Sequence, residues 1–287
     1  MDILVRIVNA LLMIVLPLVL AVILVRRLRV EWRFFFIGAG VFVFSQVLHL
    51  PFNFLVLNPL LIRLGLTSPQ GGLPLLYFAL IFGFSAGIFE GLARYIGFRF
   101  WAKDARDWKS GLMMGAGHGG IEAIFLGILA LYALIQILAL GGKDLATVLP
   151  LEQVALAQAQ IDAYWALSWP MALMGAVERV SALCLHLSAS LLILQAFRRK
   201  NGLWILAGIV WHALFDAVAV YAVRVWGVYT TELILFVMAG FAVGVIFLLR
   251  DQPGGETPPD GSPHQPQSES ASPVLSVENL EDSKFSG

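Results

Sequence analysis

Residues 110–139 read SGLMMGAGHGGIEAIFLGILALYALIQILA, a long apolar run in which His118 and Glu122 are the only acidic, basic or imidazole side chains. A helix of about 20 apolar residues crosses the roughly 30 Å hydrocarbon core of a bilayer, so this run predicts a membrane helix. Further apolar runs predict more such helices at 4–25, 34–57, 75–98, 168–197, 203–222 and 230–249. The expected fold is therefore an all-α, polytopic integral membrane bundle of about seven transmembrane helices.

The composition of the chain agrees with a membrane protein. Of its 287 residues, 59% are hydrophobic and 13% are charged, and the mean hydropathy is +0.82. In soluble domains, roughly 45–50% of the residues are hydrophobic and about 25% are charged. The formal net charge is zero, which gives no support to a basic surface for nucleic acid. A single cysteine, Cys184, excludes an intramolecular disulfide and a thiolate metal cluster, and we expect it to pack in the core.

Basic residues are distributed unevenly between the predicted loops. Four lie within 26–33, four within 99–109 and three within 198–200, and Arg250 follows the last span, whereas the alternate loops hold Arg63, Lys143 and Arg224, one each. Cytoplasmic loops are enriched in Lys and Arg. We therefore expect the N-terminus outside and the C-terminus in the cytoplasm, in the plasma membrane of a prokaryote.

Residues 1–250 form the predicted transmembrane domain, with the catalytic helices within about 75–222. Two further segments are expected to lie outside the bilayer core. Residues 251–287 are rich in Pro, Gly, Ser and acidic residues and predict a disordered cytoplasmic tail, in which His264 is given no role. Residues 143–165 mix apolar and polar side chains at helical spacing, which predicts a helix lying at the outer membrane surface.

Ionisable side chains within the spans are the strongest functional signal, because each costs several kcal/mol to insert. They occur in the third to sixth spans: Glu90, Arg94, His118, Glu122, Glu178, Arg179, His186, His212 and Asp216. At about 1.5 Å of rise per residue, six of them fall roughly 12–20 Å from the cytoplasmic helix ends: Glu90, His118, Glu122, His186, His212 and Asp216. Residues four apart share a helix face, so four helices predict one polar pocket. Glycines on both sides of His118 are expected to leave room there for water or a peptide.

Packing could explain single members of this set. Glu90 and Arg94 could form a buried ion pair, and Arg179 could neutralise a carboxylate without taking part in chemistry. His49, at the end of a span, is expected at the membrane interface with a structural role. A G-x-S-x-G match surrounds Ser85, but it lies within an apolar helix and not in the strand-turn-helix context of a nucleophile elbow, so we interpret it as helix packing.

Four segments carry a resemblance to a known family: FEGLARY (89–95), GAGHGGIEAI (115–124), ERVSALCLH (178–186) and WHALFDA (211–217). They resemble the YhfC family of predicted intramembrane peptidases, over somewhat more than half of the chain. A weaker likeness reaches the PrsW-type and CAAX-endopeptidase (Abi/CPBP) families, whose pattern is EExxxR or EExxK, a histidine motif, then HxxxN or HxxxD. This chain differs in having Phe89 before Glu90 where those families have a Glu pair, and Asp216 where many have Asn.

The resemblance implies a place for each motif and an activity. The first motif corresponds to Glu90 with Arg94, the last to His212 with Asp216, and the middle histidine to His186 or His118. The activity we expect is hydrolysis of a peptide bond in a membrane-associated protein or peptide by an activated water. Glu90 would move the proton from water to the leaving amine, while His186 and His212 would orient that water or bind the oxyanion. The supporting residues are Arg94, His118, Glu122, Glu178, Arg179 and Asp216.

The residues also leave alternatives open. A glutamic-type mechanism requires no cofactor, but His118, His186, His212 and Glu90 match a zinc site in ligand type. HExxH is absent, so the usual zincin motif is not the source of such a site. A proton- or ion-coupled transporter is a second function class, because buried His, Glu and Asp also relay protons, although no inverted repeat supports it. A non-catalytic membrane scaffold is the third.

Overall fold

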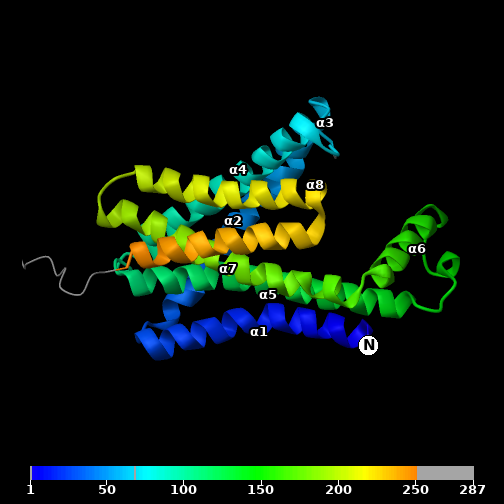
Figure 1. The fold of residues 1–287 in the computed structure, drawn as a ribbon, viewed down its shortest axis with the longest axis horizontal. Coiled ribbons are helices and arrows are strands. Elements are labelled where there is room, and N and C mark those ends of the chain that lie inside the picture. Colours follow the sequence, from blue (N-terminus) through cyan, green and yellow to red (C-terminus); the bar gives the residue numbers. More distant parts are fainter. Residues whose placement is uncertain (1, 68, 251–287) are drawn as a thin grey trace, which may run out of the picture. The chain divides into compact units, whose positions relative to one another are not determined.

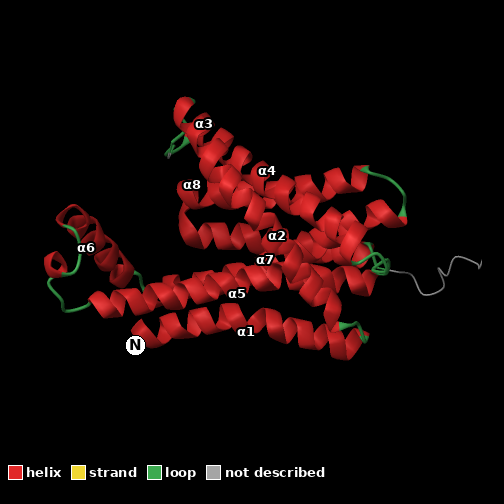
Figure 2. Ribbon diagram, turned by 180° about the vertical axis from the view of Figure 1, so that it is seen from behind, coloured by secondary structure: helices red, strands yellow, loops and turns green. Residues whose placement is uncertain are grey.

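A computed structural model describes residues 2–67 and 69–250, and within them the chain forms helices joined by loops (Figure 1; Figure 2). The long helices are α1 Asp2–Leu28, α2 Trp32–Phe52, α4 Gly72–Ile96, α5 Trp108–Leu140, α7 Trp169–Arg198 and α8 Leu203–Leu248. The shorter elements are the π-helices η1 Asn53–Leu57 and η2 Gly97–Trp101, the 3-10 helix η3 Leu145–Thr147, α3 Asn58–Arg63 and α6 Leu151–Ala166. The predicted tail at 251–287, with His264, lies outside the described residues.

The last long helix supplies two of the predicted spans. In the described residues, 6 helices are long and apolar enough to cross a membrane. One of them, α8, has 46 residues and turns back on itself at Gly227, whose φ of 76° and ψ of 173° suit glycine (Figure 1). Its two limbs contain the predicted spans 203–222 and 230–249. The polytopic all-α membrane bundle expected from the sequence is confirmed.

Local sequence fixes where the two central helices begin. At the start of α5, the side chain of Asp107 accepts a hydrogen bond of 2.7 Å from the backbone N–H of Ser110. This cap satisfies an amide that helix geometry leaves without a partner. At the start of α7, Pro170 lies in the first turn, where its missing N–H removes no helical hydrogen bond. These starts set the register of the helices that carry His118 and His186.

Small residues bring the helices close together. α5 packs against α1, α2 and α7, and α8 packs against α4 and α7. A Cβ atom on Gly87 of α4 would lie 2.6 Å from the backbone oxygen of Ile209 in α8, so only glycine allows this approach. Close van der Waals packing of this kind holds helices together in lipid, where the hydrophobic effect between them is weak. The helices with buried ionisable residues are therefore neighbours.

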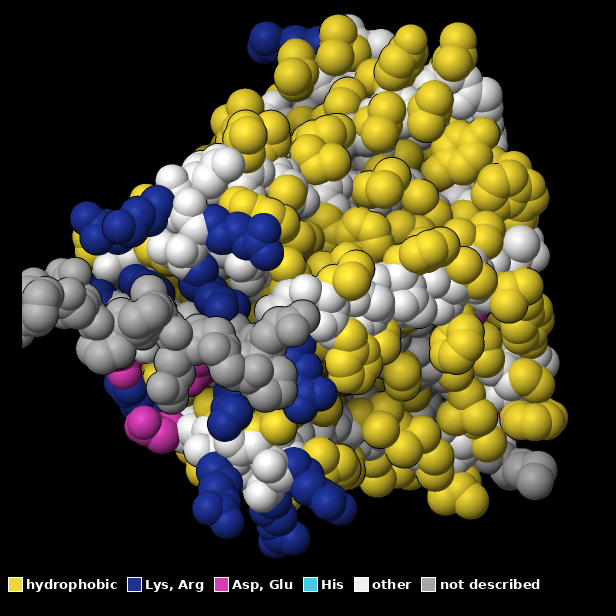
Figure 3. Space-filling view, turned by 60° about the vertical axis from the view of Figure 1, so that its left-hand side comes forward, with side chains coloured by type: hydrophobic (Ala, Val, Ile, Leu, Met, Phe, Trp, Pro, Cys, Tyr) yellow, Lys and Arg dark blue, Asp and Glu magenta, His cyan; other side chains and the backbone are white. Residues whose placement is uncertain are grey.

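The basic loops gather at one end of the bundle. The connections α1–α2, η2–α5 and α7–α8 lie at the left of Figure 1, and the Gly227 turn and α6 lie at the right. Figure 3 shows most of the Lys and Arg side chains in view at the former end, with apolar side chains over the rest of the face. Arg33, in the first turn of α2, pairs with Asp104 of the η2–α5 connection. Charge and fold therefore agree on which loops share a side.

The segment 143–165 contains a helix, as predicted. Every residue of α6 is at least partly exposed, and the helix projects from the bundle in Figure 1. Arg6 of α1 holds its C-terminal end: its Nη2 donates to the backbone oxygen of Tyr164 at 2.6 Å, and its guanidinium lies 4.1 Å from the centre of the Tyr164 ring. The position of α6 at a membrane surface stays a prediction.

Candidate functional site

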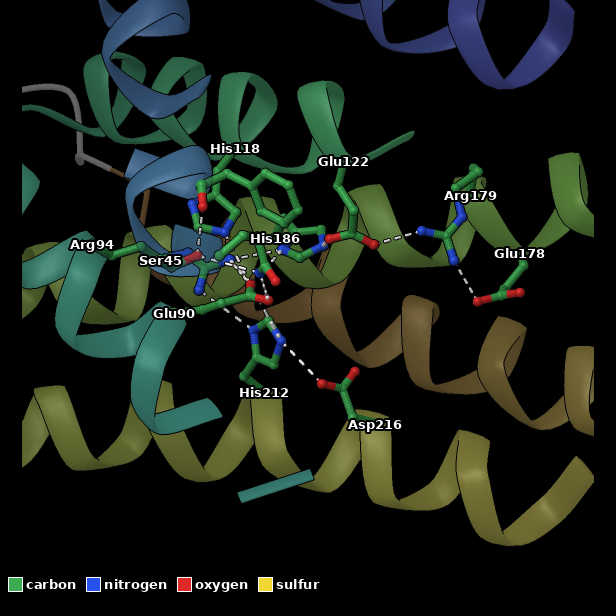
Figure 4. Close-up of polar contacts among 12 residues, drawn as sticks. Ser45, Glu90, Arg94, His118, Glu122, Glu178, Arg179, His186, His212 and Asp216 are labelled. Atoms are coloured by element: carbon green, nitrogen blue, oxygen red, sulfur yellow. Dashed lines mark hydrogen bonds and ion pairs between the residues drawn. The ribbon is translucent and has the colours of Figure 1, made fainter. Parts of the chain in front are cut away.

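Glu90 of α4 is the centre of a buried polar cluster (Figure 4). Its Oε2 lies 2.9 Å from His118 Nε2 and 3.5 Å from His212 Nε2. Arg94, one turn later on the same helix, donates to Oε2 at 3.4 Å. The other carboxylate oxygen of Glu90, Oε1, accepts a hydrogen bond of 3.3 Å from Gln46 Nε2 of α2. One carboxylate therefore joins side chains of α2, α4, α5 and α8.

Arg94 sets the proton positions on two histidines. Its side chain is 2% exposed and donates from Nη2 to His186 Nδ1 at 2.7 Å and from Nη1 to His212 Nδ1 at 3.4 Å. A guanidinium can only donate, so both Nδ1 atoms accept and a neutral ring carries its proton on Nε2. These Nε2 atoms face carboxylates, at 2.8 Å from Glu122 Oε2 and 3.1 Å from Asp216 Oδ2. Each ring is thus held between a guanidinium and a carboxylate.

The network continues toward a more exposed region. Glu122 Oε1 accepts from Arg179 Nη1 at 2.5 Å, and Arg179 Nη2 donates to Glu178 Oε1. The two carboxylates of this line become more exposed with distance from His186, at 21% for Glu122 and 41% for Glu178, while Arg179 between them is 8% exposed. In Figure 4, Glu122, Arg179 and Glu178 follow one another away from Glu90, with Glu178 at the far end of the row. A continuous chain of ionisable groups therefore links the buried cluster with the N-terminal third of α7.

The structure brings all nine of the sequence-predicted ionisable residues into this one network. Six of these residues were predicted to lie at one depth in the membrane. They make direct contacts with one another across α4, α5, α7 and α8. Glu90, His186 and His212 also approach as closely as a shared site requires, with His186 Nδ1 lying 4.0 Å from Glu90 Oε2. Their chemical roles stay predictions.

The space beside His118 differs from the prediction. A Cβ atom on Gly119 would lie 2.6 Å from Cδ2 of the His186 ring, and Gly117 faces the backbone of Phe35. The glycines therefore admit a histidine ring and a neighbouring helix, and not water or a peptide. The expectation was wrong because glycine in a membrane helix also serves close helix packing, and the sequence does not show which partner fills the space.

His49 is buried and lies in the last turn of α2, at a point where the helical path itself does not end. The helix passes through Pro51 and continues as η1 and α3, which explains why the interfacial prediction was wrong. The ring Nε2 of His49 lies 2.9 Å from Ser85 Oγ and 3.0 Å from Asn53 Nδ2, and Ser85 donates to Asn53 Oδ1 at 3.1 Å. Among the described residues no carboxylate hydrogen-bonds this ring, so the pair lacks the third member of a serine-hydrolase triad.

Glu232 is a buried acid that the sequence reasoning missed. It lies in the second limb of α8 and is 9% exposed, and its Oε2 has no hydrogen-bond partner among the described residues. The available signal was its position inside the predicted span 230–249. Its closeness to the start of that span made it resemble an ordinary helix-end acid.

A cavity of about 260 Å³ borders the cluster. Glu90, His186, His212 and Asp216 line it together with apolar side chains such as Leu126. The Asp216 side chain is 33% exposed. This volume accommodates several water molecules, each of which takes about 30 Å³ in the liquid, or a short stretch of peptide. The buried groups are therefore within reach of a small ligand.

The donor set fits a zinc ion. Glu90, His186 and His212 each offer a ligand atom within 4.8 Å of the others, and all three are buried. Imidazole nitrogens and a carboxylate oxygen are usual zinc ligands. Beside them, Nδ1 of His118 is buried without a partner among the described residues. Arg94 donates to Nδ1 of His186 and of His212, so in each ring it occupies one of the two nitrogens that could bind a metal ion.

The fold and the site together define a multi-pass membrane protein with a buried glutamate–histidine centre. Residues 12–238 match the family described as "YhfC intramembrane metalloprotease". The chain is also 31% identical, over 217 residues, to the "Uncharacterized membrane protein YhfC" of Bacillus subtilis (strain 168), a match that covers 71% of this chain and 79% of that protein. The chain therefore belongs to the YhfC family. No solved structure matches it.

Proposed function

We propose that this protein hydrolyses a peptide bond of a membrane-associated protein or peptide with a water molecule activated beside Glu90. The observation that carries the proposal is the convergence on one oxygen, Glu90 Oε2, of Arg94 and three histidines beside a cavity. A packing ion pair needs one counter-charge, so three additional imidazoles from three other helices exceed that need. The family description favours hydrolysis over transport or a scaffold role.

The described contacts support specific roles in this reaction. Glu90 accepts a proton from water as the water oxygen bonds to the carbonyl carbon, and it delivers that proton to the amine nitrogen as the C–N bond breaks. The Nε2–H group of His212, which lies 3.1 Å from Asp216 Oδ2 and 3.5 Å from Glu90 Oε2, would stabilise the negative carbonyl oxygen once that oxygen replaces Asp216 as its acceptor. Arg94 keeps His186 and His212 protonated on Nε2. In this version of the mechanism, Glu90, His212, His186 and Arg94 supply all the protein groups that the reaction uses.

The same residues would serve a metal-dependent version of the reaction. Glu90, His186 and His212 would hold a zinc ion, which when bound supplies the Lewis acidity that makes water nucleophilic at neutral pH. Glu90 would then be a ligand, and Asp216, which lines the cavity and is partly exposed, would be the carboxylate available to receive the proton. The two versions assign different roles to Glu90.

Glu90→Gln tests the proposal, because it keeps the shape of the side chain and removes its negative charge. We expect cleavage to fall by about 10²-fold or more, the usual effect of removing a general base. Purified protein in detergent is incubated with detergent-extracted bacterial membrane proteins, and new N-termini are labelled and counted by mass spectrometry. Glu152→Gln, at an exposed position of α6, is the matched control and should cleave like the native protein.

Metal content separates the two versions of the mechanism. Zinc is measured by plasma mass spectrometry in the native protein, in Glu90→Gln and in His186→Gln. Loss of both zinc and cleavage in Glu90→Gln indicates that Glu90 is a ligand. A native protein that cleaves without zinc, together with a Glu90→Gln variant that does not cleave, indicates a glutamic-type base. Full cleavage by Glu90→Gln would refute the proposed function.

A further inference from the structure

A second cavity, of about 380 Å³, adjoins the first between α7 and the two limbs of α8. Its walls include the apolar side chains of Val220, Val223 and Val228 and two acids, Glu178 and Glu232. The size falls within the roughly 300–1,000 Å³ of ordinary ligand sites, and the mixture of apolar walls with a few polar groups is typical of them.

The two cavities share part of their walls. Glu178, Ala219 and Leu235 line both. Glu178 also ends the chain of contacts through Arg179 and Glu122 to His186. A ligand in the second cavity would therefore lie directly beside the groups proposed to cleave the peptide bond. This position is that of substrate residues flanking the scissile bond.

Charge identifies what the second cavity would bind. Across both cavities, the carboxylates of Glu90, Glu122, Glu178, Asp216 and Glu232 are accompanied by only the guanidiniums of Arg94 and Arg179 in the described contacts. Arg179 is already shared between Glu122 and Glu178. Glu232 is left with a buried oxygen that has no partner among the described residues. An unpaired buried carboxylate is costly, which makes it a site for an external cation.

We propose that the second cavity binds the part of the substrate next to the scissile bond, and that a protonated nitrogen of the substrate pairs with Glu232. The proposal rests on the proposed function and adds a substrate class to it, namely an apolar segment that carries a basic group. Valine side chains of α8 receive the apolar residues, and Glu232 receives the ammonium or guanidinium group. Selection of substrates thus depends on a charge about 7.5 Å along α8 from the Gly227 turn, because five residues separate Glu232 from Gly227 and each adds about 1.5 Å of helical rise.

Binding of defined peptides tests this assignment without any need for turnover. Four fluorescent peptides of Leu, Ala and Val are compared. Two contain one internal Lys and two contain norleucine at that position, and one peptide of each pair has a free N-terminus and the other an acetylated N-terminus. They are titrated into full-length Glu90→Gln protein in detergent. We expect the acetylated Lys peptide to bind about tenfold more tightly than the acetylated norleucine peptide, as a charge-assisted contact predicts.

Variants show whether Glu232 is the partner. Glu232→Gln on the Glu90→Gln background should remove the preference for Lys, and Glu152→Gln should retain it. If only the free N-terminus confers tight binding, and Glu232→Gln removes that preference, the cation is the α-amine and not a side chain. Equal binding of all four peptides by protein with native Glu232 would overturn the proposal. A preference for Lys that survives Glu232→Gln would also overturn it. Because binding is measured apart from cleavage, failure here is distinguishable from failure of the proposed function.

Discussion

Arg94 occupies one ring nitrogen of His186 and one of His212, so its removal frees two atoms that could bind a metal ion and tests the cation preference of the site. Arg94→Ala leaves Glu90 and two histidine nitrogens without their guanidinium partner. Breaking a buried pair in this way costs about 3–5 kcal/mol, so the apparent Tm of the metal-free variant should fall well below that of the native protein. Zinc should then raise the Tm of Arg94→Ala more than that of the native protein. Thermal unfolding in detergent, with and without zinc, measures both effects.

Two controls make the zinc response specific. Arg63→Ala removes an exposed arginine and should change neither the Tm nor its response to zinc. Magnesium, which prefers oxygen ligands, should not replace zinc in Arg94→Ala. An identical zinc shift in the native protein and in Arg94→Ala would contradict the idea that the guanidinium competes for the imidazole nitrogens.

The sequence predicted the nine ionisable residues of the network around Glu90, but it missed Glu232, misplaced His49 and gave no sign of the neutral neighbours. Glu90 and Arg94, or His212 and Asp216, are four residues apart on one helix, and insertion cost makes such residues conspicuous. Gln46 carries no charge, so the same cost argument does not identify it, although it hydrogen-bonds Glu90. Contacts between helices depend on how each helix is rotated against its neighbour, and a single sequence does not specify that rotation.

The contact of α5 with α7 depends on Gly119. In Gly119→Ala the new Cβ would lie 2.6 Å from Cδ2 of His186 and 2.8 Å from its Cβ, so the histidine ring or the helix must shift. Overpacking of this kind costs about 1–3 kcal/mol, and movement of His186 should also reduce cleavage. Gly240→Ala is the matched control, because nothing lies within 4 Å of its added Cβ. We expect that control to be neutral or slightly stabilising, as measured by Tm and cleavage; equal effects of both substitutions would contradict the packing model.

Helix positions followed from the hydrophobic runs, whereas the course of the helices between them did not. The run 34–57 predicted a membrane helix, but the structure continues it as a π-helix and α3 to residue 63. The predicted run 34–57 already passes Pro51, although a proline usually interrupts a helix since it lacks the N–H group; what composition did not indicate is that the helix goes on to residue 63. This continuation is what places His49 beside the polar cavity and not at a helix end.

At the scale of the whole molecule, the arrangement of charge predicts which end faces the cytoplasm. The loops with several Arg and Lys lie at one end of the bundle, and the loop at Lys143 lies at the other (Figure 1). By the positive-inside rule the former end is cytoplasmic. The acid Glu232, close to the Gly227 turn, would then lie near the outer side, and substrates would present their basic group from there.

Cysteine labelling measures this orientation. The chain has a single native cysteine, so Cys184→Ser provides a background for Lys143→Cys and Lys103→Cys, both at exposed loop positions. We expect an impermeant maleimide to label residue 143 in intact cells and residue 103 only after permeabilisation, because a helical bundle with seven crossings places these loops on opposite sides. A fluorescent protein fused after Arg250 should be active in the cytoplasm. Equal labelling of 143 and 103 in intact cells would refute the seven-span topology, and reversed labelling would place the basic loops, unusually, on the outer side.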